Sequence, residues 1–109
     1  STRRVPVPNA KSISHRKWVE VDVLFDDGDY SVIAGMYEGD YCLGERWNGE
    51  GEHLGFPNIA GHAVWHVVPT FLATFVLHGI VSALARKPEA GSVGSTMKSL
   101  VRLGAGHQR

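Results

Sequence analysis

The most regular pattern in the chain is an alternation of apolar and polar residues from Lys17 to Phe25. A period of two residues, with a valine at every second position, is typical of a β-strand. Strand residues point to opposite faces in turn. One face therefore carries Val19, Val21, Val23 and Phe25, and the other carries Trp18, Glu20, Asp22 and Leu24. We expect the valine face to point toward the helix that covers the sheet.

Two further strands are predicted directly after the first. Residues 26–29 read Asp-Asp-Gly-Asp, and an Asp-Gly pair tolerates the positive φ that tight hairpin turns require. Strands are then expected at Tyr30–Tyr37 and Tyr41–Trp47, separated by the short turn Glu38-Gly39-Asp40. Connections this short join antiparallel neighbours, so these strands form a meander.

A long loop and a helix complete the pattern. Residues 48–61 hold four glycines and a proline, and loops of this length are often functional or mobile. His62–Val68 alternates again and predicts a fourth strand, whose position and direction the pattern leaves open. Pro69 suits the start of a helix, which we expect over residues 70–86.

The predicted helix is unusually apolar. Its polar positions form one narrow stripe with a spacing of four residues: Thr70, Thr74, His78, Ser82 and Arg86. Apolar side chains cover nearly all of the remaining surface, which is wider than one sheet face can hide. A two-fold partner is the commonest cover for such a surface, so the sequence predicts a homodimer.

The length of 109 residues fits one domain of class α+β. We expect an antiparallel sheet of three to four strands packed on one long apolar helix over residues 17–87. Residues 1–16 are expected to form an extended basic arm. Residues 88–109 are expected to form a Gly/Ser-rich basic tail with a short helix, in which Ser95 is a candidate cap.

Charge is distributed unevenly although the net charge is zero. Residues 18–85 contain ten acids and one strong base, Arg46, whereas both flanking segments are basic. The basic segments could fold back on the acidic body or on a partner subunit. They could also reach for a polyanion such as a nucleic acid, which would make binding sensitive to salt.

The same alternation predicts a candidate binding site on the sheet face that points away from the helix. If Trp65 points toward the helix, that face carries Glu20, Asp22, Arg46, His62 and His66. A carboxylate could orient a histidine as a base, and Arg46 could bind an anion. The competing interpretation is ordinary cross-strand pairing on a solvated face.

Trp47 ends the third strand beside the long loop, and with Phe56 it would either line a small-molecule pocket or close the end of the core. Cys42 could share the outer face with a histidine as a thiol–histidine pair. It is the only cysteine, which suits a reducing compartment, and we expect a soluble cytoplasmic protein.

Metal and cofactor sites are not predicted. On a strand, His62 and His66 would lie ~13 Å apart, too far to bind one metal ion. No phosphate loop, nucleophile elbow or dinucleotide fingerprint occurs. The window 63–85 is long enough to span a bilayer, but His66, Pro69, His78 and Gly79 within it argue against a membrane segment.

Three segments carry a resemblance. The runs LGERWNG (43–49), GFP (55–57) and AVWHVVP (63–69), followed by a helix, resemble small uncharacterised bacterial proteins of mobile, integron-type gene cassettes. The resemblance implies a fold and transfers no catalytic residue.

The sequence therefore favours a binding or interaction module that is homodimeric and presents its polar sheet face and long loop to a small molecule or protein. A small enzyme with His62 or His66 as general base is one alternative. A polyanion binder acting through the basic tails is the other.

Overall fold

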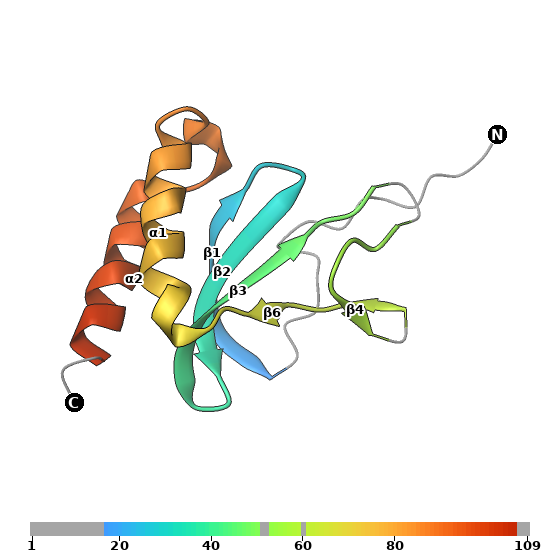
Figure 1. The fold of residues 1–109 in the computed structure, drawn as a ribbon, viewed down its shortest axis with the longest axis horizontal. Helices are drawn as coiled ribbons and strands as arrows, with labels where there is room; N and C mark the ends of the chain where they lie inside the picture. Colours follow the sequence, from blue (N-terminus) through green and yellow to red (C-terminus); the bar gives the residue numbers. More distant parts are fainter. Residues whose placement is uncertain (1–16, 51–52, 60, 107–109) are drawn as a thin grey trace.

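The fold is built on a four-stranded antiparallel sheet. The computed structural model describes residues 17–50, 53–59 and 61–106. The strands β1 (Trp18–Asp26), β2 (Tyr30–Tyr37), β3 (Asp40–Trp47) and β6 (His66–Val67) are arranged in the order β1-β2-β3-β6 (Figure 1). The α+β class and the antiparallel meander of the first three strands are confirmed.

The first hairpin turn is held by its aspartates. The Asp26 carboxylate accepts a 2.9 Å hydrogen bond from the Gly28 N–H, and Asp27 accepts two more from the N–H groups of Asp29 and Tyr30. Gly28 has a φ of 94°, which is open to glycine without strain. This turn fixes the register in which β2 returns along β1.

The predicted fourth strand is broken into two pieces. Residues His62–Ala63 form β5 and pair with β4 (Asn58–Ile59) in a separate two-stranded sheet. Only β6 joins the main sheet, antiparallel to β3, with Gly44 opposite Val67 and Glu45 opposite His66. The break lies at Val64. The Val64 N–H donates to the Pro57 carbonyl, so the chain at this point is hydrogen-bonded to the preceding loop.

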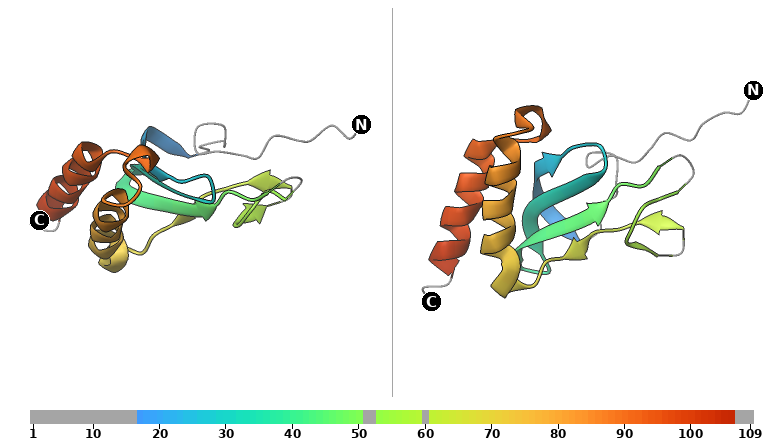
Figure 2. Two further views of the ribbon diagram at one scale, coloured as in Figure 1. Left: turned by 90° about the horizontal axis from the view of Figure 1, so that it is seen from above. Right: turned by 45° about the horizontal axis from the view of Figure 1, so that its top comes forward.

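Two helices lie against the sheet where the sequence predicted one. Helix α1 (Thr70–Leu84) begins where expected, after Pro69, and ends two residues earlier than predicted. A 3-10 turn, η1 (Pro88–Ala90), leads into α2 (Val93–Gly106), which lies beside α1 (Figures 1 and 2). Both helices are on the same side of the sheet, so α2 extends the helical layer that covers it.

Helix α2 buries a face of small polar side chains. The Ser92 hydroxyl, not that of Ser95, caps it by accepting the Ser95 N–H at 3.1 Å. Thr96, Ser99 and Leu103 are buried, and the Ser99 hydroxyl lies 2.7 Å from that of Tyr41 on β3. Residues 88–106 therefore form a 3-10 turn and a helix that packs on the domain. The expected arm 1–16 and the last three residues, 107–109, lie outside the described residues.

The sheet has an apolar cluster on each face. The helix-side core joins strand residues such as Leu24, Val32 and Leu43 to Leu77 and Ile80 of α1. The far-side cluster is smaller: Trp18, Ile33 and Trp65 are buried there, with Val21 and Val23 packed against them. The expectation that Val19, Val21 and Val23 face the helix is therefore wrong.

Val21 and Val23 pack instead in the apolar cluster of the far face, and two bulges in β1 change the faces of the residues on either side of them. The register with β2 shifts between Val19 and Asp22 and again between Val23 and Phe25. An extra residue at each shift interrupts the alternation of faces. Leu24 and Phe25 consequently both enter the helix-side core, whereas Val19 is 59% exposed.

A search of the described residues finds no helix that is long and apolar enough to cross a membrane.

Candidate functional site

The polar constellation expected from the alternation of strands is not assembled. Glu20 and Asp22 are exposed on β1, which is one edge of the sheet, whereas His66 lies on β6 at the opposite edge. His62 belongs to the separate β4–β5 hairpin. Two complete strands thus separate the two carboxylates from the nearest predicted histidine.

Arg46 is a buried anchor for the loop that follows β3. It shares the far face with Cys42, as expected, but is only 1% exposed. Its guanidinium donates to the carbonyls of Leu54, Pro57 and Val64, the last two at 3.0 and 2.6 Å. Burial lowers the pKa of this guanidinium. The arginine is used to hold the chain and is closed to a dissolved anion.

His66 points to the helix side of the sheet. Trp65 packs in the far-side cluster, so its neighbour His66 faces the other way, opposite to what we expected. There the His66 Nδ1 lies 3.3 Å from a carboxylate oxygen of Glu45, its cross-strand neighbour. A carboxylate in this position can orient the imidazole, so His66 has a defined polar partner in Glu45.

Cys42 and the histidines do not form a thiol–histidine pair. Cys42 packs in the far-side cluster, while His66 lies on the other face and His62 in the hairpin. Burial, together with the negative charge of Asp40, raises the pKa of the Cys42 thiol. A thiol with a raised pKa is less reactive because the thiolate is the nucleophile.

Trp47 does not close the end of the core. Its backbone pairs with that of Phe56 through hydrogen bonds of 2.8 and 3.1 Å, but both side chains are exposed. The Trp47 ring lies against Tyr30 instead, with 4.9 Å between the ring centroids and an angle of 58° between the planes. It therefore presents an aromatic surface beside Glu45.

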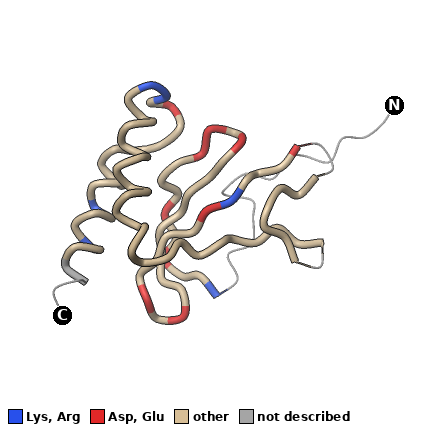
Figure 3. Tube along the Cα trace, viewed as in Figure 1, with Lys and Arg blue, Asp and Glu red and all other residues tan. Residues whose placement is uncertain are grey.

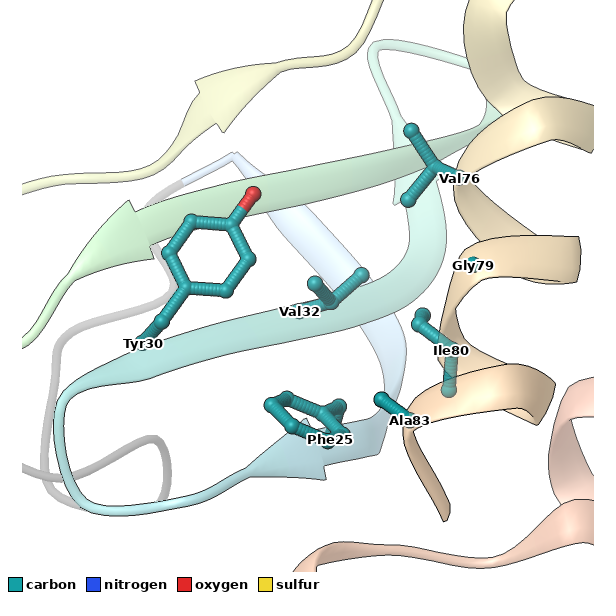
Figure 4. A pocket seen from close by; sticks show the side chains of 7 residues that line it. All are labelled: Phe25, Tyr30, Val32, Val76, Gly79, Ile80 and Ala83. Carbon is teal, nitrogen blue, oxygen red and sulfur yellow. The ribbon is translucent and has the colours of Figure 1, made fainter. Parts of the chain in front are cut away.

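A pocket of about 250 Å³ lies next to these residues, between the sheet and α1. Phe25, Tyr30 and Val32 form its sheet side, and Val76, Gly79 and Ile80 are among the residues that form its helix side (Figure 4). Gly79 leaves a gap in the helix wall, because no atom lies within 4 Å of the position a Cβ would take. The lining is almost entirely apolar.

The polar groups of the site gather at the Tyr30 edge of this pocket. The Tyr30 hydroxyl donates to one carboxylate oxygen of Glu45, and His66 lies at the other. Burial and the hydrogen bond to Glu45 raise the pKa of Tyr30, so the phenol stays protonated at neutral pH. The arrangement is an apolar pocket with a carboxylate, a phenol and an imidazole at its rim.

Charge is unevenly distributed over the molecule. Most acidic residues lie along the sheet and its turns, where Lys17 and Arg46 are the strong bases among the described residues, while Lys98 and Arg102 lie on α2 and Arg86 and Lys87 follow α1 (Figure 3). Within the described residues, Lys87 lies 3.2 Å from Asp27, and no lysine or arginine lies within ion-pair distance of Glu45. Glu45, which is hydrogen-bonded to Tyr30 at the edge of the pocket, therefore has no lysine or arginine partner among the described residues.

The second unusual surface is the outer side of α1. Phe71 and Phe75 are 74% and 71% exposed, and Leu72 next to them is also exposed. The helix contains no charged residue from Thr70 to Leu84. The wide apolar surface predicted for this helix is thus only partly covered by the sheet and by α2.

Sequence reasoning did not place Tyr30 or Glu45 among the candidate ligand-binding residues. Both alternate in step with core residues of their strands, so alternation alone puts them on the helix side of the sheet. The available signal was a glutamate on the face assigned to the helix, between Leu43 and Trp47, where an apolar residue is expected. Among the described residues no group of three or more His, Cys, Asp or Glu side chains could hold a metal ion.

Together these features define a small α+β domain with an acidic antiparallel sheet, a pocket beside a helix and an uncovered apolar helix face. Comparison of the chain with protein-family models, with curated proteins and with solved structures gives no match.

Proposed function

We propose that the protein is a small interaction module that forms a homodimer through the outer face of α1. The observation that carries this proposal is the pair of exposed phenylalanines, Phe71 and Phe75, one turn apart on the same side of the helix. Large aromatic side chains dominate the energetics of protein interfaces. Leaving two of them in water forgoes roughly 1.5–3 kcal/mol for each side chain.

The composition of α1 favours a second copy of the same chain as the partner. A two-fold axis brings identical surfaces together, so a charged residue near the axis would face its own charge. Helix α1 has none between Thr70 and Leu84. Its exposed polar residues are Thr70, His78 and Ser82, which are uncharged or can remain at the rim of an interface.

The test compares three exposed apolar residues that differ in position. Phe71→Lys and Phe75→Lys place charges on the proposed interface, and Val101→Lys places one on α2 at a residue that is 71% exposed. Lysine is a good helix former, so the helices should be retained. Molar mass is measured by light scattering after size-exclusion chromatography.

We expect the unmodified protein and Val101→Lys to have twice the 11.9 kDa mass of one chain, and both phenylalanine variants to be monomers. An unmodified protein that is monomeric at tens of micromolar refutes the proposal. So does a phenylalanine variant that remains a dimer.

We further propose a cytoplasmic location and a kinship with the bacterial gene-cassette proteins. The single cysteine supports the first, and the three segments at 43–49, 55–57 and 63–69 support the second.

A further inference from the structure

We propose that the pocket between α1 and the sheet binds a small amphipathic cation. The apolar body of the ligand occupies the pocket and its ammonium group pairs with Glu45 at the rim. The site adjoins the Phe71–Phe75 surface, because Gly79 follows Phe75 by one turn on the same face of α1. The proposed binding does not require the dimer.

The pocket is suited to an apolar body of modest size. Its volume of about 250 Å³ is below the usual range of roughly 300–1,000 Å³ for drug-sized ligands, which favours a single ring with a short chain. Phe25 and Val32 belong to the rigid sheet, so one wall is fixed. The other wall includes Gly79, where an added Cβ would meet no atom within 4 Å. We infer that a large side chain at this position would occupy the space that the ligand needs.

The rim selects a positive head group. Glu45 accepts a hydrogen bond from Tyr30 and lies beside His66, but it has no lysine or arginine partner among the described residues. An ammonium group can therefore supply the charge that the carboxylate lacks, through a charge-assisted hydrogen bond. The negative charge of Glu45 attracts a cation and repels an anion.

The aromatic residues at the rim add to this selectivity. Tyr30 lines the pocket, and Trp47 packs against it with an exposed ring. A cation within about 6 Å of a ring face is stabilised by the negative potential of the π system. An alkylammonium beside Glu45 would lie next to both rings.

The experiment uses three probes of matched shape: phenethylammonium, the neutral phenethyl alcohol and the anionic phenylpropanoate. Binding is followed at neutral pH by two-dimensional NMR of the backbone amides. We expect phenethylammonium to shift the signals of Tyr30, Glu45 and Gly79, and to bind at least about tenfold more tightly than phenylpropanoate.

Two variants separate the contributions of the pocket and its rim. Gly79→Leu fills the pocket and should abolish binding of both the cation and the alcohol. Its matched control is Gly104→Leu on α2, which also has open space at the Cβ position and should bind like the unmodified protein. Glu45→Gln should weaken phenethylammonium about tenfold while leaving the alcohol unchanged.

Several outcomes overturn the proposal: no binding of the cation at millimolar concentration, equal affinity for the anion, or unchanged binding by Gly79→Leu. Phenethylammonium that binds only to the Phe71→Lys variant also overturns it, because a phenylalanine of the partner subunit then fills the pocket. The amide spectra report whether each variant is folded, so loss of binding is distinguished from loss of structure.

Discussion

Arg46 has the opposite role to the one its residue type suggests. It is the only strong base among residues 18–85, and the sequence indicates an anion-binding group on an open sheet face. In the structure the loop that follows β3 covers it, and its guanidinium donates to three carbonyls from Leu54, Pro57 and Val64. A planar guanidinium can bind several acceptors at once in fixed directions, which a lysine ammonium cannot reproduce.

Replacing Arg46 by methionine should therefore lower the free energy of unfolding. The substitution leaves the buried carbonyls without donors, and we expect a loss of about 2–4 kcal/mol, measured by urea denaturation. The matched control is Arg102→Met, since Arg102 is exposed over the Tyr41 ring and should contribute about 1 kcal/mol or less. Equal losses in the two variants would contradict the role assigned to Arg46.

Prediction at the level of single residues succeeded where the strands are regular. The register between β2 and β3 runs without a shift, and Tyr41, Leu43 and Cys42 lie on the faces that alternation assigns to them. On β1 the same reasoning failed, because a bulge moves Phe25 onto the face of Leu24. Glu20 has a φ of 54° within the first shift, a conformation that no alternation of apolar and polar residues encodes.

At the scale of elements, Trp18 links β1 to β3 across the far face of the sheet. Its ring lies over Gly44, where an added Cβ would be 3.0 Å from ring carbons of Trp18 and from Ile33. It also contacts Tyr37, with the ring centroids 5.1 Å apart. Gly44 in β3 thus leaves space for the Trp18 side chain, which comes from β1, two strands away.

Gly44→Val should destabilise the protein, although valine is the better strand former. We expect a loss of about 1–3 kcal/mol from overpacking against Trp18. Combining the substitution with Trp18→Leu should recover part of that loss, because the smaller side chain makes room. Thermal unfolding of the two single variants and the double variant measures this coupling, and strictly additive losses would show that the two positions do not share space.

The two helices show what the hydrophobic pattern of the sequence can predict and what it cannot. Helix α1 was predicted from its start at Pro69 because its apolar surface is strong and its first residue is marked. Helix α2 is longer than the short helix expected, because two of the three residues described as buried in it, Thr96 and Ser99, are polar and do not contribute to an apolar pattern. Small polar residues can be buried when they hydrogen-bond, as Ser99 does with Tyr41.

At the scale of the whole molecule, the sequence predicted the class and the main layers, and it missed the candidate site. The site depends on which strand becomes an edge and on which way β6 faces, and both follow from long-range packing. Trp65 joining Trp18 in the far-side cluster turns His66 toward Glu45. The local sequence pattern could not predict this orientation, because the Trp65 side chain could have pointed to either face of the short strand.

The outer face of α1 is an exposed apolar surface without charged residues, and our central proposal is that two copies of the chain pair through it. The most direct measurement is isotope-filtered nuclear Overhauser spectroscopy on an equal mixture of labelled and unlabelled protein, which detects only contacts between copies. We expect intermolecular signals from the rings of Phe71 and Phe75 to residues of α1 in the other copy. An absence of such signals, or signals confined to Val101 on α2 or Val19 on β1, would contradict the assignment of α1 as the surface of self-association.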